Sequence, residues 1–198
     1  MNIFRLTLML PIIVSFAAQA SESPWFSFSG IDWKVRTDKT ERPGVGKSTL
    51  EITGDNDLQG SGLLYAIAGK KGPVGFALVE IVAEANASAF NGLCFDFTGG
   101  PTGSHFQALL KDDQSDQPEG TLTFQRDFMA TAEKKTYCFS FSEFTATIRG
   151  AAVSNFSLNR KSLESFSLQI SRSSQKEPLL SISPLPFDFT LSGKVRFR

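Results

Sequence analysis

Apolar and polar residues alternate one for one over much of this 198-residue chain, and this pattern limits the possible folds most strongly. The clearest runs are 93–97, 122–128, 137–141, 166–170 and 187–191. Such alternation is typical of antiparallel strands that bury one face. Clusters of turn-forming residues separate the runs, at 99–103, 112–120 and 171–178. We therefore predict an all-β protein, folded as an antiparallel β-sandwich.

Two neighbouring segments depart from the alternation. Residues 74–82 are apolar at both odd and even positions, which predicts a central strand or one covered on both faces. Residues 82–89 have a helical composition over a short length. Beyond residue 20 the chain has no repeat, linker or change of composition, so we predict a single domain over residues 21–198.

The first twenty residues resemble a targeting signal. Arg5 precedes an apolar run over residues 6–18, and Ala18-Gln19-Ala20 fits a small-x-small cleavage site. The run is too short to span a membrane. We predict a signal peptide over 1–20 and a mature chain that starts at Ser21, exported to the periplasm or secreted; an uncleaved amphipathic anchor is the alternative.

The composition excludes several kinds of partner. Twenty basic side chains balance twenty acidic ones, so no positive field favours nucleic acid. The chain has 19 Phe but only two Trp and two Tyr, and Phe lacks the polar group that suits an exposed binding face. Most of the aromatic residues are therefore predicted to pack the core.

Residues 44–49, Gly-Val-Gly-Lys-Ser-Thr, resemble a phosphate-binding loop at first sight. That loop needs a glycine where this chain has Glu41, together with a preceding buried strand and a following helix. Pro43 lies just before the motif, and residues 50–52 read as a strand. We predict that nucleotide does not bind.

No catalytic set or metal site emerges either. His105 is the single histidine, and a structural or solvated role suits it better than catalysis. Four acidic residues could hold Ca²⁺ through clustered oxygens, but their spacing fits a solvated hairpin tip better: Asp112, Asp113, Asp116 and Glu119. We predict a protein that is not an enzyme and that carries no cofactor and no metal.

Five short motifs, in order, resemble the complex I intermediate-associated protein family, the thirty-kilodalton one. They are Trp33 with 44–48, 60–65 with 75–77, 91–97, 141–144, and Arg149-Gly150. The resemblance covers residues 25–191. The chain departs from the pattern at Val45, at Thr136-Tyr137, and in lacking a proline before Phe141. The resemblance implies a galactose-binding-like jelly roll and a role in protein assembly.

The two cysteines, Cys94 and Cys138, lie at the polar parity of their strands. In a jelly-roll order these strands are neighbours, and the hairpin of residues 106–110 and 121–128 is nested between them. Residue numbers of antiparallel partners add to a constant, 232 for the two cysteines, and pairing 105–106 with 125–126 gives nearly the same constant. We predict a disulfide in an oxidising compartment. Two unpaired, half-exposed thiols remain the alternative.

The predicted function is an exported, non-catalytic module that binds a protein partner. A carbohydrate-binding module is the alternative, because galactose-binding-like sandwiches often hold sugars. Sugar sites need exposed Trp or Tyr rings, and the candidates here are Trp25, Trp33 and Tyr65. Tyr137 shares its parity with core phenylalanines and is a weaker candidate.

Overall fold

The computed structural model describes residues 22–27, 32–37, 48–65, 75–101, 103–171 and 184–198. The predicted signal peptide and the lysine of the 44–49 motif lie outside these residues. Within them, one short 3-10 turn, η1 (Phe141–Glu143), is the sole helical element, and no helix is long and apolar enough to cross a membrane.

The strands bear out the all-β prediction. In chain order they are β1 (Ser23–Ser27), β2 (Lys34–Thr37), β3 (Thr49–Thr53), β4 (Leu58–Leu64), β5 (Phe76–Ala85), β6 (Gly92–Gly100), β7 (His105–Asp112), β8 (Asp116–Gln117), β9 (Gly120–Met129), β10 (Lys135–Ser140), β11 (Thr145–Ile148), β12 (Ala151–Ala152), β13 (Leu163–Ser171) and β14 (Leu185–Phe197).

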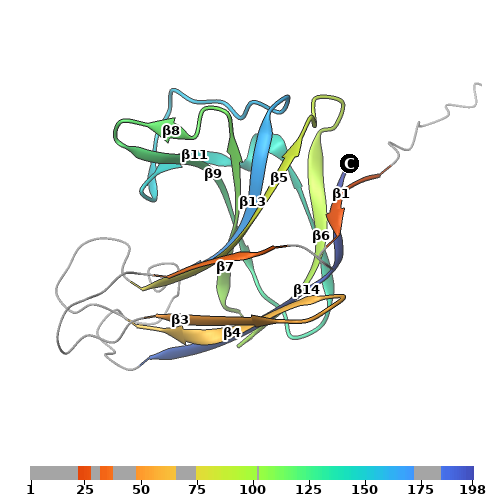
Figure 1. The fold of residues 1–198 in the computed structure, drawn as a ribbon, viewed down its shortest axis with the longest axis vertical. Helices are drawn as coiled ribbons and strands as arrows, with labels where there is room; N and C mark the ends of the chain where they lie inside the picture. The colour runs from red at the N-terminus through yellow and green to blue at the C-terminus, as the bar shows by residue number, and fades with distance from the viewer. Residues whose placement is uncertain (1–21, 28–31, 38–47, 66–74, 102, 172–183) are drawn as a thin grey trace, which may run out of the picture.

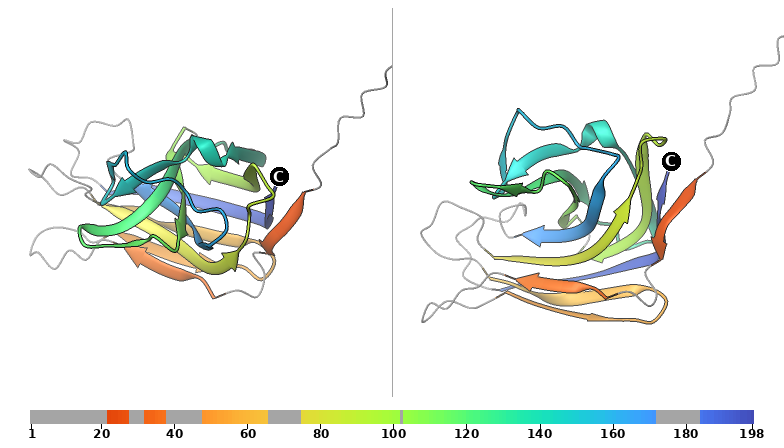
Figure 2. Two further views of the ribbon diagram at one scale, coloured as in Figure 1. Left: turned by 90° about the horizontal axis from the view of Figure 1, so that it is seen from above. Right: turned by 45° about the horizontal axis from the view of Figure 1, so that its top comes forward.

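These strands form two packed antiparallel sheets, as Figures 1 and 2 show. The six-stranded sheet has the order β10-β6-β14-β4-β3, with β1 paired to β14. The eight-stranded sheet has the order β12-β11-β9-β7-β13-β5-β2, with β8 paired to β9. Chain neighbours repeatedly fall in opposite sheets, so the architecture is the predicted jelly-roll sandwich.

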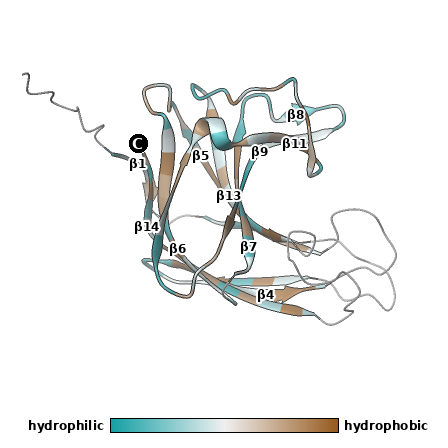
Figure 3. Ribbon diagram, turned by 180° about the vertical axis from the view of Figure 1, so that it is seen from behind, coloured by the Kyte–Doolittle hydropathy of each residue, from teal (hydrophilic) through white to brown (hydrophobic). Residues whose placement is uncertain are grey.

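Phenylalanine fills the space between the sheets. The fully buried rings include Phe95, Phe97, Phe106, Phe124 and Phe166. Edge-to-face contacts join rings from both sheets, for example Phe97 with Phe106 at 5.0 Å between centroids. Figure 3 shows the apolar residues along β13, where it crosses the middle of the molecule. Each fully buried Phe contributes about 2–3 kcal/mol of hydrophobic stabilisation.

Residues 82–89, whose composition is helical, form the end of a strand and a turn. β5 continues to Ala85, and its last residues pair with the start of β13, Val82 with Ser165 and Ala85 with Leu163. Pairing with β13 outweighs the weak local preference for helix. The central position of β5, between β13 and β2, is as predicted.

The predicted disulfide is present. Cys94 on β6 lies directly opposite Cys138 on β10, with a Cα–Cα distance of 4.1 Å. The nested hairpin, however, is β7 with β9 and belongs to the other sheet. Its register also differs from the prediction, because His105 pairs with Met129 rather than with residues 125–126. The outer pair β6–β10 and the nested hairpin lie in different sheets, so the sum of residue numbers that fits the cysteine pair does not fit the hairpin.

Candidate functional site

Trp25 of β1 packs against the rest of the sandwich. Its indole N–H donates to the Ala83 carbonyl at 3.0 Å, and its ring stacks on Phe197 with centroids 5.0 Å apart. The rings of Trp25 and Phe26 meet edge to face, with centroids 5.2 Å apart. These contacts fix Trp25 between β1, β5 and the end of β14.

Trp33 and Tyr65, the other two predicted binding residues, are both half-buried. The ring of Trp33 meets Phe26 edge to face, with centroids 6.2 Å apart. Tyr65 follows β4, whose last residue, Leu64, pairs with Leu185 at the start of β14. Trp25 contacts the other end of β14, so the structure does not bring the three predicted residues together in one site.

The acidic stretch around the β7–β8 turn serves the fold. The buried carboxylate of Asp112 accepts hydrogen bonds from the backbone N–H of Asn159 at 2.6 Å and of Gln114 at 3.0 Å. It therefore holds the segment before β13 against the turn. Among the described residues, no group of three or more His, Cys, Asp or Glu side chains is placed to bind a metal ion.

Burial together with the carboxylates of Asp112, Asp113, Asp116 and Glu84 raises the pKa of Glu164 above its ordinary value. Glu164 lies on β13, and the acidic residues gathered around it make this end of the sheet negative.

A first candidate surface is the outer side of the eight-stranded sheet, here called the polar face. Its residues alternate with core residues and lie in register across the strands. They are Arg36, Leu78, Glu80, Ser165, Ser167, Gln169, Gln107, Leu109, Lys111, Thr123, Gln125, Asp127 and Thr147. The end strands β11 and β2 turn to the same side of β13, so the sheet curls around this face (Figures 1 and 2).

Glu80 is the centre of the charge on the polar face. Its carboxylate pairs with Arg36 at 2.7 Å and with Lys111, which reaches across β13. The small residue at Ser165 leaves room for this crossing and donates a hydrogen bond to Glu80 at 3.4 Å. Burial raises the pKa of Glu80, but the Lys111 hydrogen bond, the two cations and the serine together hold it below its ordinary value of 4.5.

The amide and hydroxyl groups beside it are also paired. The Gln169 side-chain amide donates to the Gln107 carbonyl oxygen at 2.7 Å. The hydroxyls of Thr123 and Thr147 lie 2.9 Å apart across β9 and β11. The polar face therefore presents ordered hydrogen-bonding groups, and none of its residues named above is Trp or Tyr.

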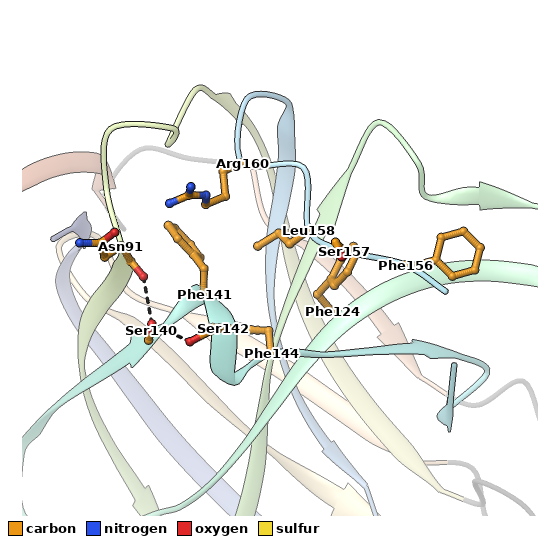
Figure 4. Close-up of a pocket in the computed structure, with 10 residues that line it drawn as sticks. All are labelled: Asn91, Phe124, Ser140, Phe141, Ser142, Phe144, Phe156, Ser157, Leu158 and Arg160. Atoms are coloured by element: carbon orange, nitrogen blue, oxygen red, sulfur yellow. Dashed lines mark hydrogen bonds between the residues drawn. The ribbon is translucent and has the colours of Figure 1, made fainter. Parts of the chain in front are cut away.

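A second candidate surface is a pocket of about 500 Å³ at one end of the sandwich, here called the end pocket. Figure 4 shows its lining, which comes from the β5–β6 loop, β9, the β10–η1 corner and the irregular segment 153–160. The lining residues are Asn91, Phe124, Ser140, Phe141, Ser142, Phe144, Phe156, Ser157, Leu158 and Arg160.

The η1 corner is held in place by local hydrogen bonds. Glu143 accepts the backbone N–H of Ser140 at 2.6 Å, in the manner of a capping box, and also pairs with Arg126 at 3.2 Å. The Ser140 hydroxyl donates to the Asn91 carbonyl at 3.2 Å and lies 3.1 Å from the Ser142 hydroxyl. These contacts orient the serine hydroxyls along one side of the end pocket.

The apolar residues that line the end pocket differ in how far they are exposed to solvent. Phe124, Phe141 and Phe144 are buried and form part of the core. Phe156 and Leu158 are half-buried and pack on that core from the segment before β13. In Figure 4 the side chain of Arg160 extends over Phe141 toward Asn91.

None of the lining residues was predicted to bind, although some of them lie in the family-like motifs. Phe141 and Phe144 belong to one of the five family-like motifs, and Asn91 begins another. Phe156, Leu158 and Arg160 were missed as site residues, because the segment that carries them has no regular structure and pairs with no strand. Its single signal was three apolar residues, Val153, Phe156 and Leu158, in a stretch that is otherwise polar.

The family model of complex I intermediate-associated protein 30 matches residues 19–182. This chain belongs to that family. The match covers most of the chain and every motif quoted for the resemblance up to Arg149-Gly150. No curated protein matches this family member in sequence.

Solved structures with the same fold include carbohydrate-binding modules. A family 11 module from Clostridium thermocellum, in complex with a β-1,3-1,4-mixed-linked tetrasaccharide, is 12% identical with a TM-score of 0.59, over 89% of this chain and 94% of that one. A family 30 module is 14% identical with a TM-score of 0.57, over 89% and 98%. Part of an agarase, AgWH50C, is 13% identical with a TM-score of 0.51, over 89% and 24%. At these identities the likeness establishes the fold alone.

Proposed function

We propose that this family member is an exported, non-catalytic binding module that holds a protein partner at the end pocket. The observation that carries the proposal is the composition of that pocket. Half-buried Phe156 and Leu158 lie over buried phenylalanines, with Ser140, Asn91 and Arg160 around them. A partly desolvated apolar centre with a polar rim is the usual anatomy of a protein interface.

A protein partner suits the end pocket better than a glycan does. Sugar rings stack on broad, exposed aromatic faces, whereas Phe141 and Phe144 are only 7% and 8% exposed. Trp25 is committed to contacts with Phe197 and Ala83. An apolar side chain of a partner can fill the hollow beside Leu158 without any exposed ring.

Glycan binding is the second candidate, and the polar face favours it. The paired amides of Gln107 and Gln169 offer both donors and acceptors to hydroxyl groups along a curled sheet. The same face also carries the Arg36–Glu80–Lys111 cluster, so a ligand there meets charge as well as neutral amides.

Export is part of the proposal. It rests on the signal-like residues 1–20 and is compatible with the disulfide, which persists in oxidising compartments. Intact-mass analysis of protein from its native host is expected to give an amino terminus at Ser21. Recovery of Met1 in the mature protein would contradict export by cleavage.

The function is tested by photo-crosslinking in the native host. A photo-reactive amino acid at Leu158 is expected to attach to one defined protein, whereas the same group at Lys194, an exposed residue of β14, is not. Equal capture from both positions, or no protein adduct from Leu158, would overturn the proposal. A glycan array probed with wild type and Gln169→Ala tests the second candidate in parallel.

A further inference from the structure

We propose that the end pocket takes the carboxyl-terminal residue of its partner: a bulky apolar side chain against Leu158, and a terminal carboxylate on Arg160. This inference rests on the proposed function and names the chemistry of the partner.

The charge of the end pocket comes from Arg160. Among the described residues that line it, Arg160 alone is ionised at neutral pH. Its Nη1 donates to the Phe90 carbonyl at 2.7 Å, which uses one of the five N–H donors and fixes the side chain. A guanidinium held in this way keeps donors for a planar, two-oxygen anion such as a carboxylate.

No described carboxylate occupies that position. The ion pairs formed between described residues do not include Arg160. Glu143, the acidic residue of the adjoining η1 corner, is already engaged by Ser140 and Arg126. Because Arg160 is half-buried, an anion placed beside it is less screened by solvent than at an open surface.

The apolar wall lies beside the cation. In Figure 4, Phe141 lies under the Arg160 side chain, and Leu158 lies between Arg160 and Phe124, with Phe156 farther along the same segment. A ligand that contacts both Leu158 and Arg160 must therefore carry an apolar group and a carboxylate close together. The last residue of a polypeptide does so when it is bulky and apolar. An internal Asp or Glu lacks the apolar group, and an internal apolar residue lacks the anion.

The test uses the full mature protein and three probes, measured by calorimetry or by NMR titration. N-acetyl-Gly-Gly-Phe is expected to bind, and its carboxamide is expected to bind about tenfold more weakly, because the charge-assisted hydrogen bonds to Arg160 are lost. Phenylpropanoate, a free aromatic acid without a peptide chain, is expected to bind more weakly than the tripeptide. Equal affinity for the acid and the amide, or for phenylpropanoate and the tripeptide, would overturn the inference.

Variants locate the effect. Arg160→Gln is expected to abolish the preference for acid over amide, whereas Lys161→Gln removes a charge from the next, exposed residue and is expected to preserve it. Leu158→Ala is expected to weaken acid and amide by the same factor. A preference that survives in Arg160→Gln contradicts the inference. If Leu158 crosslinks one protein but acid and amide bind alike, the proposed function stands and the carboxylate assignment falls.

Discussion

Removing the disulfide is expected to cost this protein much of its stability. Cys94 and Cys138 are 44 residues apart, and the loop they close contains β7, β8 and β9. In the chain-entropy model, a cross-link over a loop of this length stabilises the fold by about 4 kcal/mol at 25 °C, because it restricts the unfolded chain. Single domains are stable by about 5–15 kcal/mol in all, so the loss is a large share.

The assay is denaturant unfolding of wild type and of Cys94→Ala/Cys138→Ala. The double variant is expected to unfold at a lower denaturant concentration and to lose about 4 kcal/mol of unfolding free energy. Reduced wild type should match it. Thr136→Ala is the matched control on the same strand: it removes one hydrogen bond to Asp96, of 2.6 Å, and should cost only about 1 kcal/mol. A loss below about 1 kcal/mol in the double variant, or two free thiols in exported protein denatured without reductant, would refute this reasoning.

Three further substitutions test the electrostatics and the packing. Because the pKa of Glu80 is lowered, its ion pairs stabilise the fold above pH 4.5, and this stabilisation is lost as pH falls through the lowered pKa. Glu80→Gln should therefore cost about 3 kcal/mol of unfolding free energy at pH 7 and much less at low pH. Urea titrations at the two pH values measure the difference. Glu164→Gln should raise the melting temperature at pH 7, because burial and nearby carboxylates disfavour its charged form, whereas Glu143→Gln should lower it; the opposite order in thermal melts would contradict the assignment. Gly62→Ala should destabilise by more than about 2 kcal/mol, since its Cβ would lie 2.0 Å from the Thr49 carbonyl oxygen, and an unchanged unfolding midpoint would count against this register of β3 on β4.

Much of the fold could be predicted because each strand buries one parity. Leu93 and Phe95 point inward from β6, so Cys94 between them had to face the other way. The partner strand followed from the matching alternation around Cys138. Period-two patterns carry no information about which sheet a strand joins. The placement of β7 and β9 opposite β6 and β10, and the register of His105 on Met129, therefore came from the structure.

The candidate site was harder to predict for a related reason. Trp25 and Trp33 attract attention as rare aromatic residues, but the sequence does not show that both rings pack on the core residue Phe26. Leu158 and Arg160 belong to a segment without strand pairing, where alternation has no meaning. They become significant once the fold brings the segment before β13 onto the η1 corner.

The central claim, that the end pocket holds a protein partner, is tested most directly by measuring the affinity of the crosslinked partner for two variants. Leu158→Ala changes the end pocket, and Gln169→Ala changes the polar face on β13. We expect Leu158→Ala to weaken binding about tenfold, as truncation of an interface anchor does, and Gln169→Ala to leave it unchanged. Full affinity in Leu158→Ala together with a loss in Gln169→Ala would contradict the account.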